Sequence, residues 1–128
     1  SKAERQRTAV ASILALNPKI IILDEPTTGL SPGETTSLMD TVKILNEAGT
    51  TIITITHDMW VVAKYCSRVV LMSDGRVVLD GPTRDVFSKI SELEKYDIEV
   101  PQVVRLSNKL FGQTFLTVDE FVENVKTQ

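Results

Sequence analysis

Residues 20–27 read Ile20-Ile21-Ile22-Leu23-Asp24-Glu25-Pro26-Thr27, and they contain the strongest strand signal of the sequence. Four apolar residues in a row, with no polar residue between them, are typical of a strand buried on both faces of a parallel sheet. The run stops at an acid pair and a proline, so the strand is expected to end there in a loop of small residues. The stretch therefore predicts an α/β fold with a parallel sheet.

Helix signals lie on both sides of this strand. Apolar residues at helical spacing predict an amphipathic helix over residues 2–16, which Asn17-Pro18 ends because the residue before a proline is disfavoured in helical conformation. Residues 31–34, with the sequence Ser-Pro-Gly-Glu, combine an N-cap, a proline at the first helical position and a glutamate three residues after the cap. A helix is expected from there to Ala48-Gly49, and a second strand over Thr51–Thr56.

The remaining sequence predicts a hairpin and several short helices. Asp74-Gly75 lies between two β-rich runs, which is a typical hairpin turn. The expected elements are a helix from Met59 to about Tyr65, a hairpin over residues 68–80, a short helix over 82–87, and helices after Pro101 and Thr117. We therefore expect an α/β part over residues 1–89 and a small helical appendage over residues 90–128.

Composition excludes several classes of protein. The 128 residues are enough for one domain of about 100–200 residues, and the net charge of −3 argues against a nucleic-acid partner. Cys66 is a single cysteine, so no disulfide forms within the chain and a reducing compartment is expected. No apolar run approaches the roughly 18 residues of a membrane span. A cytoplasmic location is therefore expected, and a first residue other than Met suggests a fragment.

The acid pair Asp24-Glu25 is the best candidate for chemistry, because ligands of parallel sheets bind beyond the carboxyl ends of the strands. Asp24 is short and offers oxygen ligands of the kind that Mg²⁺ prefers. Glu25 projects to a different side and could act as a general base. The alternative is that both acids only begin a loop and cap nearby amides.

His57 follows the second expected strand, so it should lie at the same sheet edge as the acid pair. A histidine there could orient a water or bind a phosphate near neutral pH, although a lone histidine is often structural. Ser1, Arg5 and Arg7 open the first expected helix, where free amides form an anion site. A solvated basic helix start explains these three residues equally well.

Several motifs, in the correct order, resemble those of ATP-binding-cassette (ABC) ATPases. Residues 20–27 resemble the Walker B segment, and Thr28-Gly29-Leu30-Ser31-Pro32 resemble the D-loop. Residues 54–58, Thr-Ile-Thr-His-Asp, resemble the switch-histidine loop. Arg5-Gln6-Arg7 is similar to the residues that follow the signature motif, and the hairpin with its Gly-Pro-Thr end at 81–83 is similar to the usual ending of the family. The resemblance covers residues 1 to about 89.

The resemblance implies a role for each matched position. Asp24 would help to hold Mg²⁺, Glu25 would be the catalytic base, and His57 would contact the γ-phosphate of ATP. Ser1-Lys2-Ala3-Glu4 stands where the family has its Leu-Ser-Gly-Gly-Gln signature, so these residues would bind the nucleotide held by the opposite subunit. The cofactors implied are ATP and Mg²⁺, on a partial sheet of the P-loop NTPase type.

The resemblance also implies partners. The family works as a head-to-tail pair of ATPase subunits attached to transmembrane subunits, on the inner face of the cell membrane. Residues 90–128, with Pro101-Gln102-Val103, look similar to the C-terminal extension of cobalt- and energy-coupling-factor-type import ATPases. An ATPase that drives import of a small solute, a metal ion or a vitamin, is therefore expected.

Three departures from the family pattern keep other functions open. Lys2 and Ala3 replace the two signature glycines, Ser31 replaces the D-loop aspartate, and the 128 residues contain no G-x-x-x-x-G-K-[ST] phosphate loop. We therefore expect the isolated chain to bind Mg-ATP weakly or not at all. A truncated, non-catalytic module for dimerisation or regulation is the main alternative, and a soluble ATPase of the same superfamily is a third.

Overall fold

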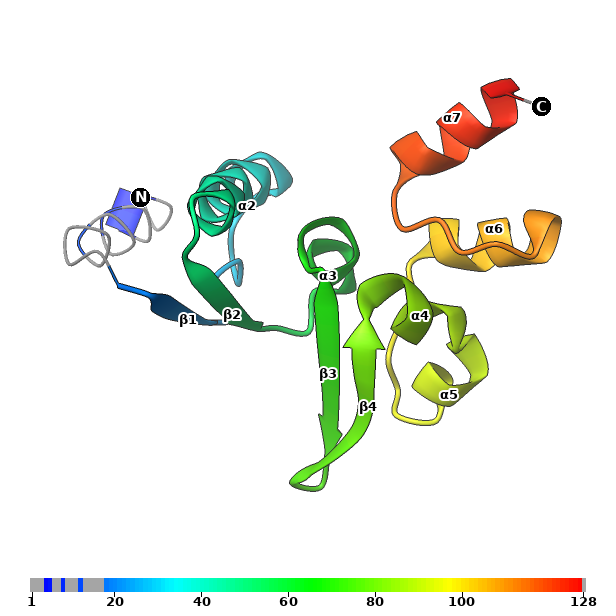
Figure 1. Cartoon of the computed structure of the whole chain (residues 1–128), viewed down its shortest axis with the longest axis horizontal. Helices are drawn as coiled ribbons and strands as arrows, with labels where there is room; N and C mark the ends of the chain where they lie inside the picture. The colour runs from blue at the N-terminus through cyan, green and yellow to red at the C-terminus, as the bar shows by residue number, and fades with distance from the viewer. Residues whose placement is uncertain (1–3, 6–7, 9–11, 13–17, 128) are drawn as a thin grey trace. The chain divides into compact units, whose positions relative to one another are not determined.

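The computed structural model describes residues 4–5, 8, 12 and 18–127 (Figure 1). The chain forms two compact units, residues 1–58 and residues 59–128. The first unit contains a strand, a helix and a second strand: β1 (Ile20–Asp24), α2 (Pro32–Glu47) and β2 (Thr51–Ile55). The second unit contains α3 (Met59–Tyr65), β3 (Arg68–Ser73), β4 (Arg76–Pro82), α4 (Thr83–Ser88), α5 (Ile90–Glu94), α6 (Gln102–Phe111) and α7 (Val118–Thr127).

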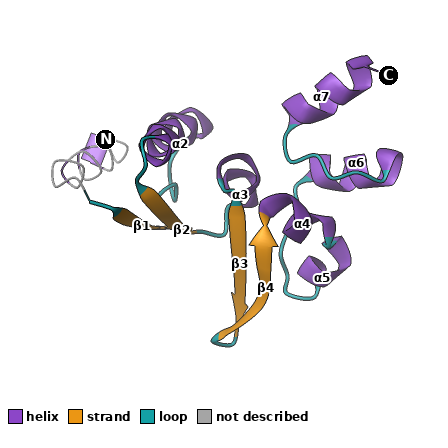
Figure 2. Ribbon diagram, in the orientation of Figure 1, coloured by secondary structure: helices purple, strands orange, loops and turns teal. Residues whose placement is uncertain are grey.

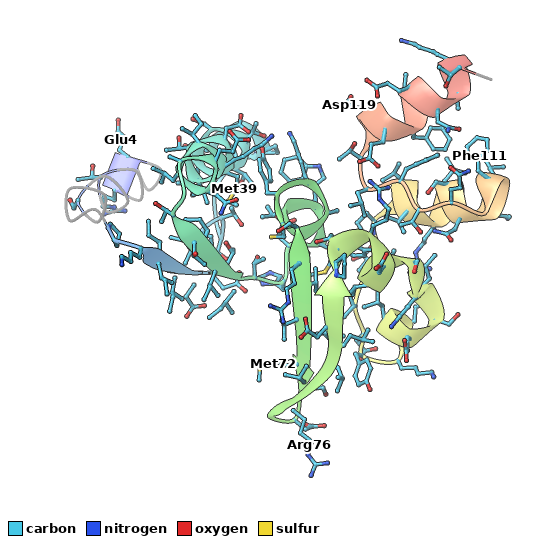
Figure 3. All side chains as sticks on the ribbon, in the orientation of Figure 1. Glu4, Met39, Met72, Arg76, Phe111 and Asp119 are labelled. Atoms are coloured by element: carbon cyan, nitrogen blue, oxygen red, sulfur yellow. The ribbon has the colours of Figure 1, made fainter. Side chains whose placement is uncertain are left out.

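The first unit is a β-α-β arrangement whose two strands are parallel, as the sequence predicts. The register runs from Ile20 opposite Thr51 to Asp24 opposite Ile55. The helix α2 connects the two strands and packs on one face of the pair (Figure 1). Among the described residues, the buried hydrophobic core of this unit comes from β1 and α2 and includes Met39, which Figure 3 labels: Ile21, Leu23, Leu38, Met39 and Val42.

Burial of β1 on both faces was expected and is not observed in the part of the chain that the structure describes. Ile21 and Leu23 are buried, but Ile20 is 58% exposed and Ile22 63% exposed. Successive side chains of a strand point to opposite faces, and α2 covers one face only. The opposite face of β1 and β2 therefore presents a row of exposed isoleucines at positions 20, 22, 53 and 55.

The predicted start and end of the long helix are confirmed. The Ser31 hydroxyl accepts from the Glu34 N–H, and the Glu34 carboxylate accepts from the Ser31 N–H at 2.9 Å, which completes the capping box. The helix ends at Glu47, with Ala48 as its C-cap. The helix predicted over residues 2–16 lies mostly outside the described residues, although Glu4, Arg5, Thr8 and Ser12 are helical.

The second unit is built on the antiparallel hairpin of β3 and β4 (Figure 2). Asp74 and Gly75 both have positive φ, 49° and 72°, which is the conformation that a two-residue hairpin turn requires. Arg76 and Met72 lie near this turn in Figure 3. Arg68 and Asp80 bridge the open end of the hairpin through two hydrogen bonds of 2.8 and 2.7 Å.

The hairpin shares one hydrophobic core with α3, α4, α5 and α6. Phe87 of α4 is 1% exposed, and it lies in a cluster with Val62, Ala63, Leu79, Val86, Leu93, Val100 and Val104. The helices predicted after Pro101 and Thr117 are confirmed as α6 and α7, whereas the five-residue helix α5 was not predicted. The division of the chain at residue 89 into two parts stays a prediction. No helix in the described ranges is long and apolar enough to cross a membrane.

Candidate functional site

The acid pair lies where the sequence predicts it, at the carboxyl end of β1. Asp24 is the last residue of the strand and is exposed to solvent. Glu25 follows it with a φ of 45°, a left-handed conformation that is uncommon for residues other than glycine. Its N–H nevertheless donates to the Ile55 carbonyl at 2.8 Å, so the backbone stays tied to β2 while the chain turns. This local strain fixes the direction in which the Glu25 side chain leaves the sheet edge.

His57 meets Glu25 at this edge. β2 ends at Ile55, opposite Asp24, and two residues later His57 Nδ1 lies 2.8 Å from Glu25 Oε1. The His57 side chain is 83% exposed and the Glu25 side chain 38% exposed. The expected convergence of the two strand ends is therefore observed, while the catalytic roles of the two residues stay predictions.

The two side chains alter the protonation of each other. The hydrogen bond from His57 is the main reason that the pKa of Glu25 lies below its ordinary value; partial burial opposes this shift and the Thr28 hydrogen bond adds to it. In turn, the hydrogen bond to Glu25 and the negative charge of its carboxylate raise the pKa of His57. The geometry thus favours an imidazolium paired with a carboxylate at a partly exposed edge of the sheet.

Thr28 is a third member of this site that the sequence analysis did not single out. Its Oγ1 donates to Glu25 Oε2 at 3.0 Å, and its N–H donates to the Glu25 carbonyl at 3.3 Å. A hydroxyl three residues after an acid at the end of a strand was the available signal. An open hollow of about 290 Å³ lies over the site, lined by Glu25, Thr27, Thr28, Gly29, His57 and Asp58.

Asp24 was predicted to hold a metal ion, and the donor set fits one class of metal site. No group of three or more His, Cys, Asp or Glu residues forms a closed metal site within the described residues. Mg²⁺ in phosphoryl-transfer sites takes only one or two carboxylates, together with waters and substrate phosphates. An exposed carboxylate at the sheet edge, next in sequence to Glu25, is compatible with a site of that open kind.

The signature-like tetrapeptide falls mostly outside the described residues. Ser1, Lys2 and Ala3 are not among them, and neither is Arg7. Glu4 is described as helical and exposed, and Arg5 likewise. The structure therefore leaves the predicted nucleotide contacts of Ser1, Lys2, Ala3 and Glu4 as predictions.

Known proteins resemble this chain over nearly all of its length. An ABC transporter ATP-binding protein of Caldanaerobacter subterraneus subsp. tengcongensis is 54% identical over 126 residues, which is 98% of this chain and 22% of that protein. The energy-coupling factor transporter ATP-binding protein EcfA1 of the same organism is 42% identical over 130 residues, covering 96% of this chain and 47% of that protein. No family model matches. The chain thus spans less than half the length of these curated relatives.

The solved structures agree with the sequence comparison. The cbiO1 protein from Clostridium perfringens, part of the ABC transporter complex cbiONQ, superposes with a TM-score of 0.63 at 37% identity, over 83% of this chain and 43% of that chain. An ATP-binding cassette of an ABC transporter, solved in its ADP conformation, gives a TM-score of 0.68 at 27% identity over 77% of this chain. The small parallel sheet with its helices is thus a portion of the P-loop NTPase fold. By sequence and by fold, the homologues of this chain are ATP-binding proteins of ABC transporters, and the chain corresponds to their C-terminal part.

Proposed function

We propose that this chain is the portion of an ABC transporter ATPase that supplies the catalytic base for ATP hydrolysis. The observation that carries the proposal is the contact of 2.8 Å between Glu25 Oε1 and His57 Nδ1, beside an open hollow at the carboxyl edge of a parallel sheet. This is the edge at which open α/β sheets bind their ligands. The homology to ATP-binding proteins supports a nucleotide as that ligand.

In the proposed reaction Glu25 accepts a proton from a water held in the hollow. The water oxygen forms a bond to the γ-phosphorus, the bond to the bridging oxygen breaks, and ADP leaves with the electron pair. His57 would contact the γ-phosphate and help to place the water. A bound Mg²⁺, held in part by Asp24, supplies positive charge that offsets the charge on the transferring phosphoryl group.

The proposed function also needs a phosphate-binding loop, a second ATPase subunit and transmembrane subunits, none of which these 128 residues supply. The sequence has no phosphate loop of the G-x-x-x-x-G-K-[ST] type, so another segment of protein would cradle the phosphates. Ser1, Lys2, Ala3 and Glu4 would face a nucleotide bound by a second ATPase subunit in a head-to-tail dimer. Transmembrane subunits would complete a transporter at the cytoplasmic face of the membrane, importing a small solute such as a metal ion or a vitamin.

Replacement of Glu25 tests this proposal. In the complete gene product that contains these residues, we expect Glu25→Gln to lower ATP turnover about 10²–10⁴-fold, because a general base contributes about that much. Nucleotide affinity, measured by fluorescence titration, should stay within about threefold of wild type, since the cradle lies elsewhere. Glu99→Gln removes an exposed carboxylate remote in sequence from the site and serves as the matched control. Normal hydrolysis by Glu25→Gln would remove Glu25 from the role of base.

A non-catalytic module for dimerisation or regulation is the second candidate. It is favoured by Lys2 and Ala3, whose side chains replace the two glycines that allow a close approach of backbone to phosphate. Stable dimers without nucleotide, together with no ATPase activity in the complete protein, would support this function. Nucleotide-dependent dimerisation with turnover would exclude it.

A further inference from the structure

The Glu25 carboxylate is held at both of its oxygens. Oε1 lies 2.8 Å from His57 Nδ1, and Oε2 accepts the Thr28 hydroxyl at 3.0 Å. The two contacts come from different places in the chain, since His57 follows β2 whereas Thr28 lies three residues after Glu25. Two such contacts define the plane of a carboxylate, and loss of both frees it to rotate about its terminal bond.

The two contacts are not equivalent under the proposed function, on which this inference rests. His57 would have a second partner, the γ-phosphate, and its ring is 83% exposed on a loop that follows the strand. A histidine that turns toward phosphate releases Glu25 Oε1, and this is the oxygen that must then accept a proton from water. During the reaction the orientation of the carboxylate therefore depends on the contact at Oε2.

Thr28 is suited to keep that contact because it belongs to the same turn as Glu25. The Thr28 N–H donates to the Glu25 carbonyl at 3.3 Å, so the two residues are linked through backbone as well as through side chains. The next turn is closed by the Leu30 N–H, which donates to the backbone carbonyl of the buried Thr27 at 3.1 Å. Any movement of this loop would therefore carry Glu25 and Thr28 together.

We propose that Thr28 is a positioning residue for ATP hydrolysis: its hydroxyl holds Glu25 Oε2 and thereby directs Oε1 toward the attacking water. Thr28 neither accepts the proton nor contacts the nucleotide in this role. It acts only through Glu25, which separates its effect from that of a residue that binds phosphate.

The test compares Thr28→Val with Thr28→Ser in the complete gene product. Valine keeps the shape but deletes the hydroxyl, and we expect kcat to fall about ten- to hundredfold, as for loss of one hydrogen bond to a charged group. KM for ATP should stay within about twofold, because the lost contact does not bind substrate. Serine keeps the hydroxyl and should restore kcat to within about threefold of wild type. Thr41→Val is the matched control, since the exposed Thr41 donates its hydroxyl to the Ser37 carbonyl within α2, at 3.0 Å.

A double-mutant cycle with Glu25→Gln separates this inference from the proposed function. If Thr28 acts through Glu25, Thr28→Val should leave the residual single-turnover rate of Glu25→Gln unchanged. A further tenfold loss in that background, wild-type kcat in Thr28→Val, or no rescue by serine would each overturn the inference. Normal turnover by Glu25→Gln alone would instead overturn the proposed function. Thermal denaturation verifies folding, and Thr28→Ala, at this exposed position, replaces the valine variant if valine fails to fold.

Discussion

Two carboxylates, Glu25 in the first unit and Glu120 in the second, are both paired with a basic side chain, but their surroundings differ. The Glu25 carboxylate contacts a ring nitrogen of His57 and accepts a hydrogen bond from the Thr28 hydroxyl, at the rim of an open hollow. The Glu120 carboxylate accepts hydrogen bonds from two nitrogens of Arg84, each at 3.1 Å, and from the Leu116 N–H at 2.9 Å. The first carboxylate borders an open hollow, whereas the second accepts three hydrogen bonds that join α4, the segment before α7 and α7 itself.

The neighbours of Glu120 make the contrast stronger. Arg84 also donates to the Thr114 carbonyl, and Asn108 donates to the Thr114 hydroxyl at 3.0 Å. Three phenylalanines, two of them with ring centroids only 5.6 Å apart, pack around the connection between α6 and α7: Phe111, Phe115 and Phe121 (Phe111 is labelled in Figure 3). A carboxylate bound by an arginine and a backbone N–H is typical of a structural ion pair, and a carboxylate that meets a histidine at an open hollow is a candidate for chemistry.

The largest expected effect on stability tests the structural side of this comparison. Phe87 is 1% exposed in the core of the second unit, so Phe87→Ala should lower the free energy of unfolding by about 3–5 kcal/mol through lost burial and a cavity. Urea denaturation of the complete protein measures this change in the free energy of unfolding. Tyr96→Ala, at an aromatic residue that is 38% exposed, should cost much less. Equal losses in the two variants would show that Phe87 is not packed as described.

A smaller effect is expected at Glu120. Burial raises the pKa of Glu120, but hydrogen bonds from Arg84 and the Leu116 N–H outweigh it, so the pKa lies below its ordinary value. Because the folded-state pKa is lowered, the stabilising contribution is present above the ordinary value of 4.5 and is lost as pH falls through the folded-state pKa. Glu120→Gln should cost about 1 kcal/mol at pH 7, since the pair is partly exposed, and this loss should shrink toward pH 3.

Thermal denaturation between pH 3 and pH 7 measures the Glu120 effect. Glu123→Gln is the matched control, because Glu123 is an exposed residue of the same helix. A cost for Glu120→Gln that does not vary with pH would contradict the assignment.

The smallest effect is expected for the exposed pair of Glu25 and His57. The pKa of His57 is raised above 6.5 by Glu25, so its contribution to stability is present below the ordinary pKa and lost as pH rises through the folded-state pKa. The pKa of Glu25 is lowered, so the carboxylate keeps its charge, and the pair persists, until the pH falls below 4.5. An NMR titration of the His57 ring should give a pKa above 6.5 that returns toward 6.5 in Glu25→Gln. An unchanged pKa in that variant would show that the pair does not form in solution.

The sequence predicted the elements whose signals are local. Four apolar residues in a row, a capping box at Ser31 and an Asp-Gly turn each fix a short segment, and all three are found. The meeting of Glu25 and His57 could also be predicted, because parallel strands connected by one helix bring their carboxyl ends to one edge. The exposure of Ile20 and Ile22 could not be predicted from the sequence, because it depends on what covers the sheet.

The contacts missed by the sequence analysis depend on geometry that appears only after folding. Thr28 reaches Glu25 because the chain turns at a positive φ, and no pattern of residue types specifies that a glutamate adopts one. Arg84 and Glu120 are separated by 36 residues, so their pairing requires the packing of α4 with the helical segment that follows. Both cases lie beyond the range of periodicity and capping signals.

The parallel register gives the turn between α2 and β2 a role at a distance. Thr51 lies opposite Ile20, and Gly49, with a φ of 103°, helps the chain to enter β2 at that point. A strand advances about 3.3 Å per residue, and a shift by one residue exchanges its two faces. A shift of β2 by one residue against β1 would therefore move the His57 imidazole away from Glu25 and turn it toward the other face of the sheet. The turn at one end of β2 thus helps to place the candidate site at the other end.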